Sequence, residues 1–225
     1  MPRQARVAPG GLVYHVLNGA AGRMKLFRHD SDFAAFERTM QQAHERFPLR
    51  ILSYCIMSNH WHFVVWPKED GDLTAFFRWL ANTHAVRWRV SHRRVGSGHL
   101  YQGRFKSFPI ERGEHLQTVC RYVERNALSA GLVRRAENWR WCSLWARTCG
   151  DETLRAMLSD WPVEPPPDWI GTVNTPLTPK ELDRLETSET RGRPFGSDQW
   201  IEQTVKKLGL RHTMRNEGRP RNAAL

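Results

Sequence analysis

The sequence has few cysteines, and their spacing fits neither a metal site nor a disulfide framework. The four, at positions 55, 120, 142 and 149, include no Cys-x-x-Cys pair, which favours reduced, packed thiols. No apolar run approaches the roughly 18 residues of a membrane span. No apolar segment follows the basic N-terminus, as it would in a signal peptide. We therefore expect a cytoplasmic protein that does not enter a membrane.

Acidic residues are also in short supply. The 225 residues include 34 Lys and Arg but 23 Asp and Glu, a formal net charge of +11. This balance favours a polyanionic partner such as nucleic acid, although it says nothing about the fold. Hydrophobic residues make up 40% of the chain, which is enough for a substantial core.

Apolar periodicity predicts a mixed fold in the first 150 residues. Strands are expected over residues 12–17, 50–57, 60–66 and 104–111, and helices over 33–47, 73–93 and 115–128. Ser58-Asn59 is a tight connection that predicts a hairpin, and Pro109 favours an edge strand. The order β-α-β-β-α-β-α is similar to the split βαβ, ferredoxin-like arrangement. We expect an α+β protein with helices packed on an antiparallel sheet.

The C-terminal third has a different composition. We predict a domain over residues 1–150, a proline-rich extended linker over 151–180, and a basic extension with one short helix over 181–225. The extension contains Gly-Arg-Pro twice, at 192–194 and 218–220. Such arms either lie on phosphates or in a minor groove, or form a solubilising tail.

The segment His60-Trp-His62 is the first candidate for chemistry. Strand side chains alternate, so the two histidines share one face and Trp61 takes the other. Two imidazoles side by side can hold a metal ion. The alternative is a pair of partly exposed histidines on a solvated face, and the pair by itself favours this alternative because short motifs often occur by chance.

The helix at 115–128 supplies what such a pair needs. Tyr122 and Asn126 are four residues apart and therefore share one face. Asn126 would add an oxygen ligand to His60 and His62 around Mg²⁺ or Mn²⁺, with open positions for substrate and water. Tyr122 would attack phosphorus as a covalent nucleophile. The alternative role for Tyr122 is that of an amphipathic core residue.

Several cations are candidates for contacts with nucleic acid, because Lys and Arg neutralise phosphates. They come from the basic face of the helix at 73–93, from the last strand, from the flanks of Tyr122 and from the two Gly-Arg-Pro segments. The candidates are Arg87, Arg104, Lys106, Arg121, Arg125, Arg193 and Arg219.

The motifs together resemble a known family. The residues 57–63 (Met-Ser-Asn-His-Trp-His-Phe), 101–106 (Tyr-Gln-Gly-Arg-Phe-Lys) and 122–126 (Tyr-Val-Glu-Arg-Asn) follow Tyr14-His-Val16 in family order. Ala130-Gly-Leu-Val133 and the segment 139–143 come after them. They are similar to the REP-associated tyrosine transposases, within the HUH single-tyrosine transposases of insertion-sequence type.

The resemblance implies a fold and an activity. The fold would be the HUH nuclease version of the ferredoxin-like sheet, with His60, His62 and Asn126 as metal ligands. Tyr122 would form a 5′-phosphotyrosine link and release a 3′-hydroxyl, and reversal would rejoin the strand. The partner would be single-stranded or hairpin DNA, often a repeated extragenic palindrome. The protein would then be nucleoid-associated in the cytoplasm.

The resemblance leaves the oligomeric state and two other activities open. Mobile relatives are typically dimers, but the longer C-terminal extension here favours a monomer that covers its own site. The main alternative function is a non-catalytic module that binds hairpin DNA or RNA. A metal-dependent hydrolase without a covalent step is the third.

Overall fold

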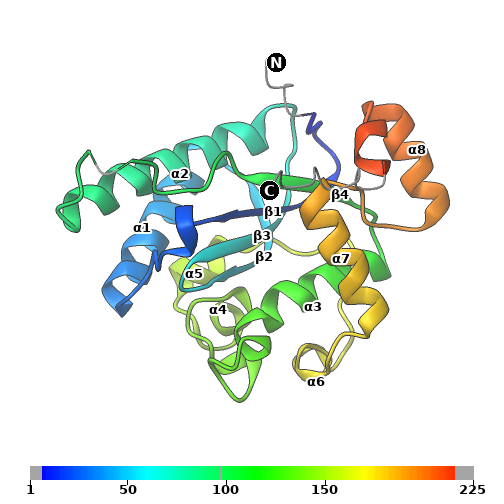
Figure 1. The fold of residues 1–225 in the computed structure, drawn as a ribbon. Coiled ribbons are helices and arrows are strands. Elements are labelled where there is room, and N and C mark those ends of the chain that lie inside the picture. Colours follow the sequence, from blue (N-terminus) through cyan, green and yellow to red (C-terminus); the bar gives the residue numbers. More distant parts are fainter. Residues whose placement is uncertain (1–6, 97, 216–225) are drawn as a thin grey trace, which may run out of the picture.

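A four-stranded antiparallel sheet forms the centre of the fold in the computed structural model, which describes residues 7–96 and 98–215 (Figure 1). Its order is β2-β3-β1-β4, and every pairing is antiparallel. The strands are β1 (Val13–Gly19), β2 (Arg50–Ile56), β3 (His60–Trp66) and β4 (Lys106–Ile110). The predicted α+β class, the hairpin of β2 and β3 and the edge position of β4 are confirmed.

Helices cover both faces of this sheet. Figure 1 shows α1 and α2 on one side, and α3 with α6 and α7 on the other. In the described residues, the α-helices are α1 (Asp30–Arg46), α2 (Asp72–Ser91), α3 (Glu114–Ser129), α4 (Ser143–Cys149), α5 (Glu152–Ala156), α6 (Trp169–Asn174), α7 (Pro179–Arg191) and α8 (Asp198–Leu208). Short 3₁₀ turns occupy Ala21–Arg23, Ala136–Asn138 and Arg211–Met214. Within the described ranges, no helix has the length and apolar character that crossing a bilayer requires.

The alternation of β3 divides the core into two layers. Trp61, Phe63 and Val65 are fully buried in the cluster that contains the apolar faces of α1 and α2. Val64 is buried in the opposite cluster, which contains the apolar face of α3. His62 has the same strand parity as Val64, so it projects toward α3. The predicted split between Trp61 and its two neighbouring histidines is therefore present.

The segment 151–180 is not the extended linker that its prolines predict. It contains α5 and α6, and α6 packs against α3. The indole of Trp161 donates to the Leu52 carbonyl at 2.8 Å, and that of Trp169 donates to Glu124 Oε2 at 2.7 Å. The prolines lie between short helices, and the large apolar residues among them pack on the domain. The domain limits at 150 and 180 stay predictions.

The helix α7 was also absent from the predicted elements, although its ends have clear signals. The Thr178 side chain accepts from the backbone N–H of Glu181, and the Glu181 carboxylate accepts from that of Thr178 in a capping box. Pro179 stands at the first turn, and Gly192 ends the helix with φ of 71°. After α7 the chain runs beside β4, where the Phe195 N–H donates to the Pro109 carbonyl at 2.9 Å. Phe195, which directly follows the first Gly-Arg-Pro segment, thus pairs with the edge strand β4, and the second Gly-Arg-Pro segment lies outside the described residues.

Candidate active site

The two histidines of β3 lie on the face of the sheet that α3 covers. His60 pairs with Gly19 of β1 and His62 pairs with Leu17, so the neighbouring strand fixes their positions. The Asn59 Oδ1 atom lies 2.7 Å from His60 Nδ1 in a hydrogen bond. This contact occupies one ring nitrogen of His60 and leaves Nε2 for another partner.

Tyr122 and Asn126 project from α3 toward the same place. The Tyr122 ring lies 5.8 Å from the His62 ring, centroid to centroid, and is nearly perpendicular to it. The Asn126 side chain lies close to the His60 side chain in the same cavity. The structure therefore brings together all four residues that the sequence predicts for the site. Their individual roles stay a prediction.

His15 is a site residue that the sequence prediction does not include. It lies at the centre of β1 and is fully buried. Its Nε2 atom is 3.0 Å from His62 Nδ1, and the two rings are stacked 5.1 Å apart with an interplanar angle of 6°. The alternation of β1 was the available signal, because His15 has the same parity as Val13, which faces α3. Nothing in the sequence indicates that His15 lies beside His62.

Glu189 of α7 is the second residue that the prediction missed. Its Oε1 atom lies 3.7 Å from His62 Nδ1 and 3.8 Å from His15 Nδ1. The Tyr122 hydroxyl lies beside its carboxylate, and the interaction between them raises the pKa of the phenol. Burial raises the pKa of Glu189 to about 7, and the nearby Lys106 ammonium limits the rise. α7 thus places a carboxylate directly against the predicted nucleophile.

The electrostatics of the site favour neutral groups. Burial lowers the pKa of both His60 and His62, and for His62 the neighbouring imidazoles lower it further. Neutral imidazoles are the forms that bind metal ions. Burial raises the pKa of Tyr122, and the Glu189 carboxylate raises it again. The phenol is therefore held protonated, and an added positive charge is needed to favour its ionised form.

A cavity of about 390 Å³ has a donor set that fits a divalent cation, and its lining includes His60, His62, Tyr122, Asn126 and Glu189. His60, His62 and Asn126 offer two imidazoles and an amide oxygen. His15, His62 and Glu189 form an overlapping group whose ligand atoms all lie within 4.8 Å of one another. In the described part of the chain, the buried atoms His15 Nδ1 and Glu189 Oε1 have no hydrogen-bond partner. Nitrogen and carboxylate ligands together suit Mn²⁺ well, and Mg²⁺ less well.

A comparison with protein families decides where the chain belongs. The family model described as "Transposase IS200 like" matches residues 10–126, more than half of the chain. The chain belongs to the IS200-like transposase family. The match includes the strands β1–β4, the two histidines of β3, and Tyr122 and Asn126 of α3. Glu189 and the whole of α7 lie beyond it, so this transposase adds a carboxylate from its C-terminal extension.

Two solved structures are similar to this transposase to different degrees. A REP-associated tyrosine transposase bound to a REP hairpin matches with a TM-score of 0.52 at 15% identity, over 79% of this chain and 95% of that chain. A candidate transposase from Deinococcus radiodurans R1 gives a TM-score of 0.39 at 13% identity, over 55% and 96% respectively. Among curated proteins, none matches this chain. The family resemblance in the motifs is confirmed, and the first structure supports the fold.

The predicted DNA-contacting cations of this transposase have different surroundings. Arg104 and Lys106 line the cavity beside the histidines. Arg121 instead pairs with Glu181 of α7 at 2.6 Å, and Arg125 donates to two backbone carbonyls at the end of α6. Arg87 donates to Thr39 and Gln42 of α1. The guanidinium groups of Arg87, Arg121 and Arg125 thus bind other parts of the protein, and the structure does not bring them to the site.

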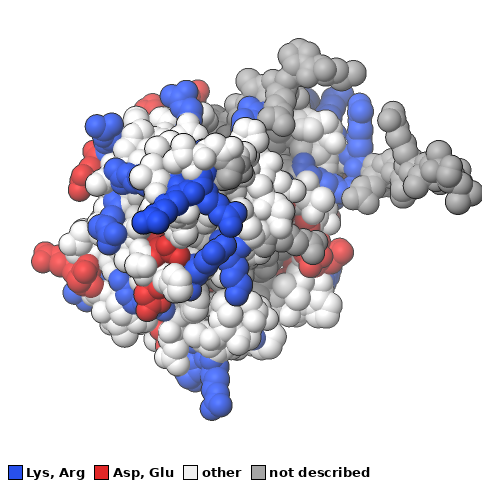
Figure 2. Space-filling model, turned by 60° about the vertical axis from the view of Figure 1, so that its left-hand side comes forward, with Lys and Arg blue, Asp and Glu red and all other residues white. Residues whose placement is uncertain are grey.

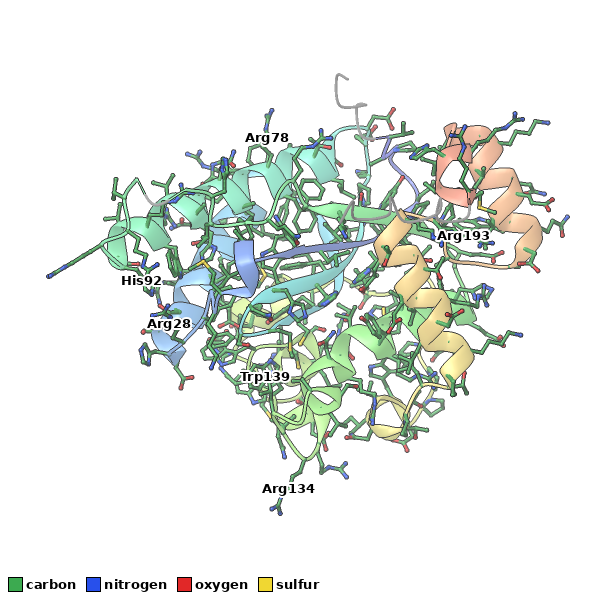
Figure 3. The ribbon with its side chains drawn as sticks, in the orientation of Figure 1. Arg28, Arg78, His92, Arg134, Trp139 and Arg193 are labelled. Atoms are coloured by element: carbon green, nitrogen blue, oxygen red, sulfur yellow. The ribbon has the colours of Figure 1, made fainter. Side chains whose placement is uncertain are left out.

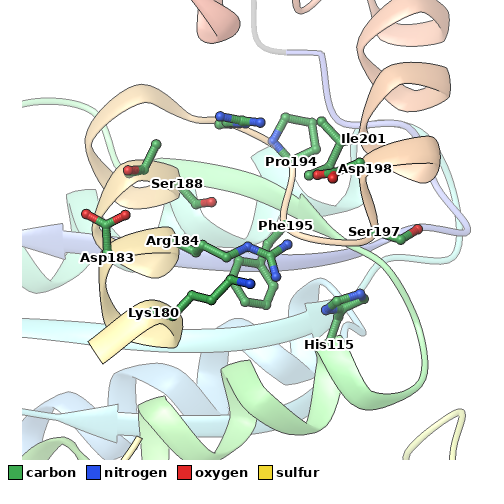
Figure 4. A pocket seen from close by; sticks show the side chains of 12 residues that line it. His115, Lys180, Asp183, Arg184, Ser188, Pro194, Phe195, Ser197, Asp198 and Ile201 are labelled. Atoms are coloured by element: carbon green, nitrogen blue, oxygen red, sulfur yellow. The ribbon is translucent and has the colours of Figure 1, made fainter. Parts of the chain in front are cut away.

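A second cationic cavity lies on the other side of α7. It measures about 470 Å³, and Figure 4 shows Lys180 and Arg184 of α7 extending toward Phe195 within it. Arg193, labelled in Figure 3, is also among its lining residues. Lys and Arg side chains gather over the face drawn in Figure 2 as well. The predicted contact Arg219 lies outside the described residues.

Proposed function

We propose that this chain is a metal-dependent transposase that cleaves and rejoins single-stranded DNA beside a hairpin, through a 5′-phosphotyrosine intermediate. The observation that carries the proposal is the position of Tyr122. Its ring lies against His62 in the cavity that also contains His60 and Asn126. A nucleophile and a set of metal ligands thus share one small space.

The reaction we propose is an exchange of one phosphoester for another. The Tyr122 oxygen attacks the scissile phosphorus, the bond from phosphorus to the 3′ oxygen breaks, and the tyrosine proton is lost as the 3′ oxygen gains one. The 5′ phosphate is then esterified to Tyr122, and attack by a 3′-hydroxyl reverses the step. Because each ester replaces another, rejoining needs no external source of energy.

The residues of the chain divide the remaining tasks. His60, His62 and Asn126 would hold Mg²⁺ or Mn²⁺, which supplies charge stabilisation at the scissile phosphate when bound. Glu189 lies beside the Tyr122 hydroxyl and would direct the attacking oxygen by accepting its hydrogen. Asn59 holds the His60 ring by its Nδ1 atom. Positioning of this kind is a large part of catalysis of phosphoryl transfer.

A hairpin is the substrate that the comparisons support. The structural neighbour with the same fold is bound to a REP hairpin, and the charge of +11 on this chain suits a polyanion. α7 completes the cavity within one chain, which supports action as a monomer. A dimeric mass in solution would argue against that part of the proposal.

Covalent capture tests the proposal directly. We expect the full chain to form a detergent-stable adduct with a 3′-labelled single-stranded oligonucleotide that carries a hairpin and randomised flanks, in Mg²⁺ or Mn²⁺. Tryptic digestion should place the nucleotide on Tyr122-Val-Glu-Arg125, a peptide with one tyrosine. The Tyr122→Phe variant, with the same shape and no hydroxyl, should form no adduct. EDTA should prevent the adduct as well.

Two other outcomes would each overturn the proposal. Cleavage that survives Tyr122→Phe without an adduct would assign a hydrolase that uses water. Salt-dependent hairpin binding without cleavage, unchanged by EDTA and by His60→Ala, would assign a non-catalytic binding module.

The cations on the cavity rim should contribute to hairpin affinity. Arg104→Gln and Lys106→Gln should each weaken binding similarly for all sequences, and should reduce the slope of log K against log salt by about 1. Fluorescence anisotropy at several salt concentrations measures both. Arg134→Gln is the matched control, because Arg134 is exposed, lies in the segment after α3 (Figure 3) and is not among the residues that line the cavity. Equal losses in all three variants would show that the contribution is only net charge.

A further inference from the structure

His15 is a buried polar residue beside the proposed site that the proposed reaction leaves without a task. Its side chain is fully buried at the centre of β1, in contact with His62 on one side and facing α7 on the other. Burial lowers the pKa of His15 to about 3, so it stays a neutral imidazole. Burying a polar ring in a sheet costs free energy unless its nitrogens are paired. The partners of those two nitrogens are therefore informative.

The contact with His62 requires one donor and one acceptor. It joins His15 Nε2 and His62 Nδ1 at 3.0 Å, and a histidine that binds a metal ion does so as the neutral imidazole. A neutral imidazole carries one hydrogen, so the contact settles which nitrogen of His62 is bare. If His62 donates from Nδ1, its Nε2 has a free lone pair. If His62 accepts at Nδ1, its Nε2 carries the hydrogen and cannot bind a metal ion.

The second nitrogen of His15 distinguishes the two arrangements. When His15 Nε2 accepts, His15 Nδ1 carries the hydrogen and points toward Glu189 Oε1, 3.8 Å away. A donor then faces an acceptor, and both atoms are buried without another partner in the described part of the chain. In the reverse arrangement, a bare nitrogen faces the oxygen of a carboxylate. With Glu189 ionised, above its pKa of about 7, the first arrangement is the favourable one.

We propose that His15 is a positioning residue that accepts a hydrogen bond from His62 Nδ1 and thereby holds His62 Nε2 bare and directed at the metal. The inference rests on the proposed function, in which His62 is a metal ligand. It gives His62 the same kind of support that His60 receives from Asn59, whose Oδ1 occupies His60 Nδ1. Outer partners of this kind fix both the tautomer and the orientation of a ligating histidine.

Ring-nitrogen NMR tests the proposal on the unaltered protein. We expect long-range proton–nitrogen spectra of the ¹⁵N-labelled full chain in EDTA to show His62 protonated at Nδ1 and bare at Nε2. His15 should likewise be protonated at Nδ1. The opposite tautomer of His62 would overturn the proposal. Because the measurement uses the unaltered protein, it does not depend on the folding of a variant.

Metal affinity gives the second measurement. His15→Phe keeps a buried ring without an acceptor, and we expect it to weaken Mn²⁺ binding by about 10- to 100-fold in calorimetry. His15→Gln restores an accepting oxygen and should recover most of the affinity. His84→Phe is the matched control, because His84 is also buried but lies in the layer of α1 and α2. Its Mn²⁺ affinity should equal that of the wild type.

The outcomes separate this inference from the proposed function. Unchanged Mn²⁺ affinity in His15→Phe, with affinity lost in His62→Ala, would overturn the role of His15 alone. A wild-type chain that binds no Mn²⁺ would instead overturn the metal site itself. Electron spin-echo spectra of bound Mn²⁺ should show two coordinated imidazole nitrogens. A third coordinated imidazole nitrogen that is absent in His15→Phe would show that His15 is a direct ligand, and would contradict the proposal.

Discussion

Alanine in place of His62 should reduce strand cleavage by about 10³-fold or more, while hairpin binding stays close to that of the wild type. The loss follows from the proposed role of His62 as a metal ligand, because metal stabilisation of the scissile phosphate is worth several kcal/mol. Binding should persist because contacts of Lys and Arg side chains with the DNA phosphates, and not the metal site, supply most of the affinity for nucleic acid. His62 is buried, so its loss also leaves His15 Nε2 without its partner.

Single-turnover cleavage in Mn²⁺ measures the effect, and anisotropy on the same oligonucleotide measures binding. His212→Ala is the control for loss of a histidine, because His212 is exposed and lies outside the cavity. Cleavage by His62→Ala at the wild-type rate would place the metal elsewhere and leave the β3 histidines with a structural role. Loss of hairpin binding together with cleavage would indicate that the variant has lost its fold, which circular dichroism would detect.

The parts of the site that the sequence predicts are those fixed by local periodicity. A strand alternates its side chains, so His60 and His62 share a face whatever the rest of the chain does. A helix returns to the same face after four residues, so Tyr122 and Asn126 also stay together. Each pair therefore depends only on the local secondary structure. The two pairs come together only if α3 covers the face of the sheet on which the histidines lie. The structure establishes that it does.

The residues that sequence reasoning missed are those positioned by long-range packing. His15 reaches His62 because β1 and β3 are neighbours, and Glu189 reaches both because α7 folds back over the sheet. The signal for α7 was nonetheless present: Thr178-Pro-Lys-Glu181 is a capping box with proline in the first turn. Because Pro179 follows many other prolines, the sequence pattern assigns it to a linker. A proline at a helix start and one in a linker differ only in their context.

Cations are the least predictable part of the site. Arg121 and Arg125 flank the predicted nucleophile in sequence, which makes them candidates for phosphate contacts. In the fold they bind α7 and α6, two helices that the sequence prediction does not include. A guanidinium pairs with whatever acceptors the fold brings to it. An arginine can therefore be assigned to DNA contact only once the positions of the helices that pack against its own helix are known.

Alanine in place of Trp61 should have the largest effect on stability, lowering the free energy of unfolding by about 3 to 5 kcal/mol. Trp61 is fully buried, stacks on Phe77 with ring centroids 5.6 Å apart, and contacts Phe36 and Phe63. Its Nε1–H donates to the Tyr101 hydroxyl at 3.1 Å. Removing the indole leaves a cavity among these rings and a buried hydroxyl without one of its partners.

Urea denaturation and thermal melting measure this change, and for a chain of this size we expect the melting temperature to fall by about 10 to 15 °C. Trp61→Phe separates the two contributions, because it keeps a ring in the layer and removes only the indole N–H and part of the volume. It should cost clearly less than Trp61→Ala. Equal losses in the two variants would mean that the hydrogen bond to Tyr101, and not the filled volume, holds β3 in place. Because Trp61 stands between His60 and His62, a strand that loses this anchor should also hold Mn²⁺ less tightly at temperatures below the melting transition.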